Sequence, residues 1–249
     1  MGAVRAELLK LKRSLSWTVV AALPLMAVLA GVVNTLVCGA ALDEGWHTLW
    51  LRTVVVYGLF PLAAGVAVLA SLLWRVEHQG GNWNALMGRP TSALAVVSAK
   101  VVVLAVLAAL MQAVLVAGVS VAGTAVFGLP GALPPRYLLV SAVIVAACLP
   151  AAALQSALSM LMRSFAAPVV VAVVGSTAGT LLVLIGHGTL STVMPYALLT
   201  RATQLGTGVF GDDGTVTGEG AALVVAAASA LTAAVVAGSA ALLNRRDVH

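Results

Sequence analysis

The feature that most constrains this chain is a series of six long apolar windows, separated by short breaks that are charged or rich in glycine and proline. A helix that crosses the hydrocarbon core of a bilayer needs about 20 mostly apolar residues. Six windows meet that length: residues 17–41, 53–74, 97–127, 137–162, 166–186 and 221–243. Only 8% of the residues are charged, against roughly 25% in a soluble domain, which excludes a water-soluble globule. We predict an all-α membrane protein whose residues 1–249 form a single domain of six transmembrane helices.

The distribution of basic residues predicts the orientation, because positive charge is retained on the cytoplasmic side of a membrane. Three basic residues fall on one side of the predicted spans, Arg52, Arg136 and Arg201, together with Asp43, Glu44, Asp212, Asp213 and Glu219. The other ten fall on the opposite side: Arg5, Lys10, Lys12, Arg13, Arg75, Arg89, Lys100, Arg163, Arg245 and Arg246. We therefore expect both termini in the cytoplasm. The net charge of +5 then reflects membrane topology and not a nucleic-acid partner.

Three segments outside the spans carry further expectations. Residues 3–16 predict a basic amphipathic helix on the membrane surface, although a simple charged anchor for the first span is an equal alternative. Its apolar positions recur at helical spacing: Val4, Leu8, Leu11 and Leu15. Residues 75–92 form the most polar loop on the basic side, where we expect contact with another protein. Residues 187–220 predict a re-entrant region on the outer side, with short helices between 192 and 205.

The inventory of reactive side chains argues against an enzyme. The four histidines show no metal-binding spacing, and no phosphate-binding GxxxxGK[ST] sequence is present, so we expect neither a metal site nor a cofactor on this chain. Ser176 and His187 would lie on one span about three turns apart, a poor arrangement for an intramembrane protease. The spans also lack a deeply placed charged residue, which disfavours an ion-coupled pump and indicates an external energy source.

Two groups of residues within the spans are candidates for binding or packing. Asn34, Gln112 and Gln155 could line a substrate pathway, but an uncharged amide more often bonds to a neighbouring helix, and we favour that interpretation. Gly175 and Gly179 form a pair of small residues one helical turn apart, which favours a close contact between helices.

The polar loop on the basic side carries a recognisable pattern. Its residues are Glu77, Gly80, Gly81, Asn82, Trp83, Leu86 and Pro90, followed by Lys100 at the start of the next span. This pattern resembles that of the membrane subunits of type-2 ABC exporters, and is most similar to permeases of lantibiotic-immunity and bacitracin-resistance transporters. The arrangement of an interfacial helix, six spans, a coupling segment after the second span and an outer re-entrant region resembles the same family over the whole chain.

The resemblance implies a function. The loop would form a coupling helix that docks on a cytoplasmic ABC ATPase, which would hold ATP and Mg²⁺. Glu77 would meet the ATPase, Gly80, Gly81 and Trp83 would shape the contact, and Arg89 and Lys100 would lie at the headgroup level beside Pro90. Two permeases, identical or different, would pair in the bacterial plasma membrane and export an amphipathic substrate, a peptide antibiotic or a lipid-like molecule.

Two alternatives to an exporter subunit remain at this point. The first is a polytopic membrane protein without a transport cycle, such as an anchor, an assembly factor or a signalling partner. The second is an intramembrane enzyme. An anchor would not need the GG-N-W sequence beside Glu77, whereas a helix that docks on an ATPase would use it.

Overall fold

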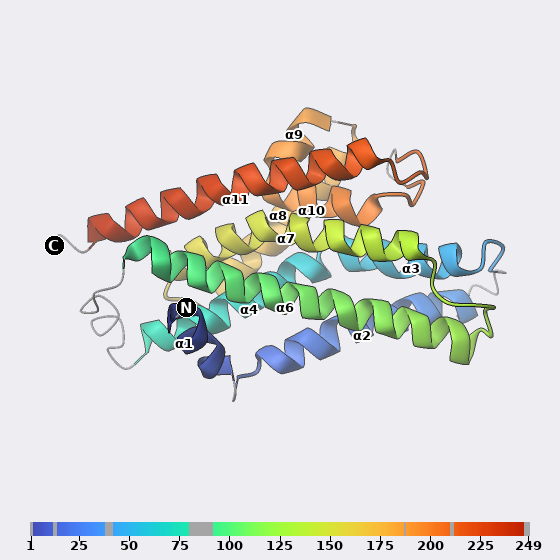
Figure 1. The fold of residues 1–249 in the computed structure, drawn as a ribbon, viewed down its shortest axis with the longest axis horizontal. Helices are drawn as coiled ribbons and strands as arrows, with labels where there is room; N and C mark the ends of the chain where they lie inside the picture. Colours follow the sequence, from blue (N-terminus) through green and yellow to red (C-terminus); the bar gives the residue numbers. More distant parts are fainter. Residues whose placement is uncertain are drawn as a thin grey trace.

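A computed structural model describes residues 2–11, 14–37, 42–79, 92–186, 188–209 and 212–246. The described chain is helical throughout, without strands, and the longest helices run along the long axis of the molecule (Figure 1). The first and last described helices approach the same end of this bundle, where α4 ends and α6 begins (Figure 1). We call this the terminal end, and the opposite end the far end.

The helices follow one another in the chain with short connections. Their bounds are α1 Gly2–Lys10, α2 Ser16–Val37, α3 Trp46–Leu59, α4 Pro61–His78, α6 Ala93–Val121, a π-helical turn Ala122–Val126, α7 Pro135–Leu161, α8 Ala166–Leu184, α9 Gly188–Val193, α10 Pro195–Gln204 and α11 Gly218–Arg246. The segment expected to hold short helices before the last span contains α9 and α10.

Five helices are long and apolar enough to cross a membrane: α2, α6 with its π-helical extension, α7, α8 and α11. The pair α3 and α4 passes the same test jointly, but the two helices are bent by 49° where they meet. The prediction of an all-helical protein with five or six spans is confirmed. The single continuous helix expected over residues 53–74 is wrong, because Pro61 begins a new helix after Phe60. Proline has no backbone N–H to continue a helical hydrogen-bond ladder and suits the first turn instead.

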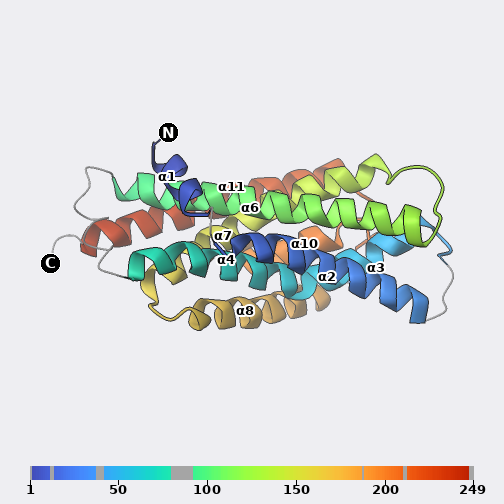
Figure 2. The same cartoon turned by 90° about the horizontal axis from the view of Figure 1, so that it is seen from below.

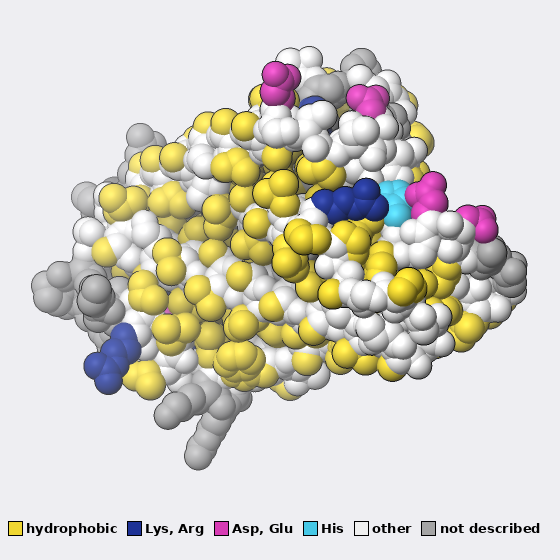
Figure 3. All heavy atoms as spheres, turned by 45° about the vertical axis from the view of Figure 1, so that its right-hand side comes forward, with side chains coloured by type: hydrophobic (Ala, Val, Ile, Leu, Met, Phe, Trp, Pro, Cys, Tyr) yellow, Lys and Arg dark blue, Asp and Glu magenta, His cyan; other side chains and the backbone are white. Residues whose placement is uncertain are grey.

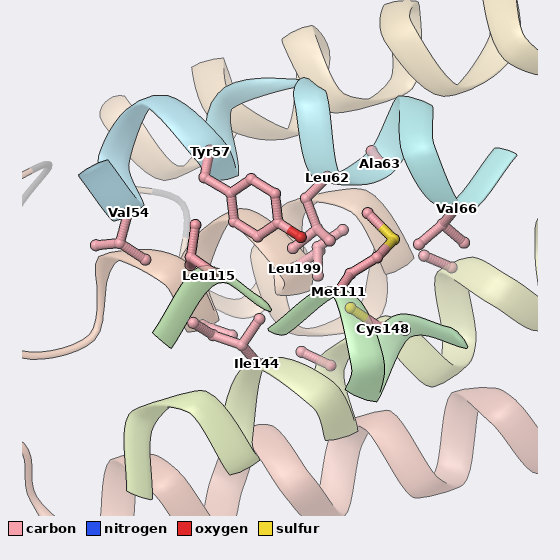
Figure 4. Close-up of a cluster of buried hydrophobic side chains, with 14 of the residues drawn as sticks. Val54, Tyr57, Leu62, Ala63, Val66, Met111, Leu115, Ile144, Cys148 and Leu199 are labelled. Atoms are coloured by element: carbon pink, nitrogen blue, oxygen red, sulfur yellow. The ribbon is translucent and has the colours of Figure 1, made fainter. Parts of the chain in front are cut away.

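The core lies where α3, α4, α6, α7 and α10 meet. Figure 4 shows large apolar side chains from these helices pointing toward one another, among them Leu62, Met111 and Ile144. The Tyr57 ring is fully buried in the same cluster and extends toward Met111 and Cys148 (Figure 4). The outer surface is also largely apolar (Figure 3), as a lipid solvent requires. Helix association in such a solvent depends on close packing and on hydrogen bonds between helices.

Helix α1 packs differently from the predicted amphipathic pattern. It lies across the terminal end beside α6 (Figure 2), with Leu11, just beyond its end, buried and Val4 half-buried. Leu8 and Leu15 are exposed, so the four expected apolar positions do not share one buried face. The buried face of α1 instead carries Glu7. This carboxylate is the starting point of the functional site described below.

Helices α8 and α10 approach closely at the two predicted glycines. A Cβ atom on Gly175 would collide with the Tyr196 ring, and a Cβ atom on Gly179 would lie 2.7 Å from the backbone nitrogen of Ala197. These glycines therefore serve a contact within the chain, where α10 seats against α8 near the far end.

We predict that Gly179→Ala destabilises the protein by about 1–3 kcal/mol, because the new methyl group meets backbone atoms that cannot move independently. Gly238→Ala in α11 is the matched control, since a Cβ atom there has no neighbour within 4 Å. It is expected to be neutral or stabilising by up to about 1 kcal/mol. Thermal unfolding of both variants in detergent micelles measures the difference. Equal melting temperatures for the two would contradict the packing described for α8 and α10.

Candidate functional site: a buried ion cluster at the terminal end

Four charged side chains from three helices meet inside the terminal end. We call Glu7 and Lys10 of α1, Glu77 of α4 and Lys100 of α6 the ion cluster. Lys10 Nζ donates to Glu7 Oε1 at 2.6 Å and to Glu77 Oε1 at 2.5 Å. Lys100 Nζ donates to Glu7 Oε2 at 2.9 Å and to Glu77 Oε1 at 3.2 Å. Each lysine therefore bridges the same two carboxylates, and the cluster joins α1, α4 and α6.

Lys100 is the most deeply buried member, with no exposed surface. Its third hydrogen bond goes to the backbone oxygen of Leu73 at 3.2 Å, and its ammonium lies 4.6 Å from the centre of the Trp74 ring. Removing an ammonium from water costs several kcal/mol unless charges and acceptors replace the lost hydration. Here three acceptors take its three N–H donors, and the aromatic face adds a cation–π contact.

The formal charges within the ion cluster cancel, with two carboxylates against two ammonium groups. Burial alone would lower the pKa of Lys10, but its hydrogen bonds to Glu7 and Glu77 outweigh that effect and raise the pKa above its ordinary value. Lys10 therefore stays protonated throughout the physiological range. A neutral cluster whose donors are satisfied can be buried, whereas loss of one member leaves an uncompensated charge.

The end of α4 is also tied to α7. Trp74 Nε1 donates to Ser156 Oγ at 2.8 Å, and the hydroxyl groups of Ser71 and Ser159 lie 3.3 Å apart. His78 Nε2 lies 2.8 Å from the backbone oxygen of Ser159. Together with the ion cluster, these contacts fix the last two turns of α4 on two sides.

The ion cluster lies directly beneath the segment that the sequence singles out for partner contact. Glu77 precedes the last residue of α4, and Lys100 lies two turns into α6, which begins after Ser92 accepts a capping hydrogen bond from the Ala95 nitrogen. The two helices that flank residues 80–91 are thus joined to each other. The predicted coupling residues Gly80, Gly81, Trp83, Arg89 and Pro90 lie outside the described residues.

The structure places Glu77 and Lys100 differently from the sequence-based expectation. We expected Glu77 to face an ATPase and Lys100 to lie among lipid headgroups. Glu77 is 4% exposed and directed toward two lysines, and Lys100 is completely enclosed. In this conformation both side chains hold the protein together internally, and neither is presented to a partner.

The amides proposed for a pathway separate into two kinds. Gln112 donates to Ser141 Oγ on α7 at 3.1 Å, and Gln155 donates to the Tyr196 hydroxyl of α10. Both side chains thus bond to neighbouring helices, while their Oε1 atoms have no hydrogen-bond partner in the described part of the chain. Asn34 is exposed on α2 and does not face the interior of this chain.

Sequence reasoning missed Glu7 and the pairing of Lys10. A signal for both exists, because Glu7 is the only acidic residue before Asp43 and precedes Lys10 by one helical turn. Glu7 and Glu77 are also the only acidic residues on the basic side before the extreme C-terminus. What the sequence does not reveal is that α1 folds back so that Glu7 reaches Lys100.

The described residues hold no group of three or more histidine, cysteine, aspartate or glutamate side chains placed to bind a metal ion. The chemistry available at the ion cluster is therefore positional: it fixes helices relative to one another.

A comparison with protein-family models gives one match, to a family described as ABC-2 family transporter protein, over residues 3–179. The matched region includes all of α1, α4, α6 and α7, and therefore the whole ion cluster. Searches of curated proteins and of solved structures give no match.

We predict that Lys100→Met destabilises the protein by about 3–5 kcal/mol, because Glu7 and Glu77 would then share a single lysine inside the bundle. Arg5→Met is the control, since Arg5 is an exposed basic residue of the same helix α1 and not a member of the ion cluster. Unfolding titrations in mixed micelles measure both.

A double-mutant cycle separates the ion cluster from a general effect of lost packing. Glu77→Gln and Lys100→Met, alone and together, should show a coupling energy of about 0.5–3 kcal/mol, because removal of one partner already removes the interaction. Strict additivity of the two changes would contradict the contact between these side chains.

Proposed function

Because the family match covers more than half of the chain, the protein belongs to the ABC-2 transporter family, and we propose that it is the membrane-spanning permease subunit of an ABC exporter. The observation that carries the proposal is the ion cluster, which joins the two helices on either side of residues 80–91. A segment that receives force from a partner is useful only if its flanking helices are fixed to the rest of the protein. The ion cluster supplies that attachment.

The energy source is proposed to be a separate cytoplasmic ABC ATPase. The chain has no phosphate-binding GxxxxGK[ST] sequence, so ATP and Mg²⁺ would be held by that partner. The terminal end would lie in the cytoplasm, because ten of the 13 basic residues fall on that side of the spans. Residues 80–91 leave and re-enter the bundle at this end, where an ATPase in the cytoplasm could reach them.

The ion cluster gives Glu77 a role different from direct contact. Movement of the coupling segment would reach α4 at Glu77 and α6 at Lys100, and both are joined to α1 through Glu7. The three helix ends would therefore move together. Glu77 is accordingly proposed as a positioning residue, with Gly80, Gly81, Trp83, Arg89 and Pro90 left as the candidates for contact with the ATPase.

The finer part of the proposal concerns the substrate and the assembly. The resemblance of the loop around Glu77 to lantibiotic-immunity and bacitracin-resistance permeases supports export of an amphipathic molecule, either a peptide antibiotic or a lipid-like compound. A second permease, identical or different, would complete the transporter in a bacterial plasma membrane. Asn34 on the exposed face of α2 is available for that pairing or for the pathway between the two subunits.

We predict that two classes of variant separate docking from coupling when the protein is purified with its ATPase in lipid nanodiscs. Gly81→Trp should abolish the complex, because a bulky side chain prevents close approach of the coupling segment. Glu77→Gln should retain the complex but lower stimulated ATP hydrolysis several-fold, because α4 is then held less firmly to α1 and α6. Co-purified ATPase and hydrolysis rate are the two measurements.

Glu44→Gln is the matched control, since Glu44 is an exposed carboxylate at the far end. It should behave as the unmodified protein in both measurements. The proposal fails if no ABC ATPase associates with the protein, or if Gly81→Trp and Glu77→Gln both match the control. In that case a membrane protein without a transport cycle becomes the better account.

A further inference from the structure

A cavity of about 340 Å³ opens beside the end of α4, between that helix and the connection from α7 to α8. Its volume lies at the lower end of the range found for small-molecule sites. Ser71 and Ser159, both buried, lie at its floor, and Arg75 and Arg163 are exposed in its lining. The ion cluster does not line this cavity, so its chemistry is independent of the contacts that hold α4 to α1 and α6.

The charge of the cavity is positive and lacks compensation within the described chain. Arg75 and Arg163 form no ion pair with a described residue, and its described lining includes no aspartate or glutamate. Two guanidinium groups facing one cavity repel each other, so an anion between them would be stabilised. Arginine presents a planar set of donors that matches phosphate oxygens particularly well.

The rest of the lining favours a phosphate that carries an apolar tail. The hydroxyl groups of Ser71 and Ser159 offer additional hydrogen bonds at the floor. Met162 and Phe165 also line the cavity, and the Phe165 side chain is exposed at the start of α8. A soluble phosphate ester would have no use for this apolar wall, whereas a phospholipid would place its glycerol and upper acyl chains against it.

Arg75 connects this cavity to a second one of about 240 Å³ on the other side of α4. The walls of the second cavity are largely apolar, with Leu11, Leu15, Leu72 and Val76, and Lys10 adds another cation. The Arg75 side chain can therefore meet a headgroup from either side of the helix. Basic pockets between transmembrane helices on the cytoplasmic side are known sites for anionic lipid headgroups.

We propose that the cavity between α4 and the α7–α8 connection binds the phosphate headgroup of an anionic phospholipid from the surrounding leaflet. The lipid links Arg75 at the end of α4 to Arg163 in the α7–α8 connection. Bound there, it holds the end of α4 from the side opposite the ion cluster. The proposal goes beyond the proposed function and needs no ATPase, so it can fail or succeed independently of the transport assignment.

The test measures lipids that remain bound to the purified permease in native mass spectra after delipidation and addition of defined lipid. Phosphatidylglycerol should bind, and zwitterionic phosphatidylcholine should bind far more weakly. Each arginine near a membrane surface contributes roughly fivefold to the affinity for anionic lipid, so Arg75→Gln with Arg163→Gln should weaken binding by about 25-fold. The corresponding double lysine variant should retain much of the affinity, because it keeps both charges.

Arg5→Gln controls for general attraction of anionic lipid to the basic surface, since Arg5 is exposed on α1 and does not line the cavity. Equal retention of the two lipids, or equal loss in Arg5→Gln and in the double glutamine variant, would overturn the proposal. Glycerol phosphate is added separately as the soluble competitor. If it binds with the affinity of the lipid, the cavity holds a phosphate ester from solution and the lipid assignment is wrong.

Discussion

The arrangement of the terminal end depends on one constraint: the ammonium group of Lys100 is enclosed by protein and must be neutralised there. No single carboxylate achieves this, because the third N–H and the remaining lone pairs would stay unsatisfied. Glu7 and Glu77 supply the negative charge, Leu73 supplies a backbone acceptor, and Lys10 balances the second carboxylate. A surface helix that would otherwise only anchor the chain is thereby joined to two spans. Buried ion pairs add little net stability, but they specify which helices meet.

This constraint gives the two ends of the bundle different mechanical properties. At the terminal end, the ion cluster and the hydrogen bonds from Trp74 and His78 hold α4 to α1, α6 and α7. Toward the far end, α4 meets α3 at a bend of 49° beside Pro61, where the helical hydrogen-bond ladder is interrupted. Such an interruption is a natural position for a hinge. A force applied at the coupling segment would then move a firmly joined group of helix ends about a break further along the same helix pair.

Sequence reasoning recovered what depends on composition and length, and missed what depends on tertiary contact. The apolar windows predict the long helices because a bilayer sets a minimum length for any span. The break at Pro61 was available in the sequence, but the apolar run continues across it and hides it. The buried role of Glu7 was not recoverable from helical periodicity, which assigned Leu8 and Leu15 to the face that packs. Those leucines face outward because in a lipid solvent apolar residues gain nothing by turning inward, whereas a carboxylate must.

The central claim is that α1 and α4 move together when an ATPase acts on the coupling segment. Spin labels at Leu9 of α1 and Val76 of α4, both exposed, allow the distance between the two helices to be measured by pulsed electron resonance in the complex. We predict one narrow distance distribution that is the same in the nucleotide-free and ATP-trapped states, and a broadened one when Lys100→Met is introduced. A distance that changes on ATP binding with the ion cluster intact would contradict the account, because the cluster would then not join the helices during the transport cycle.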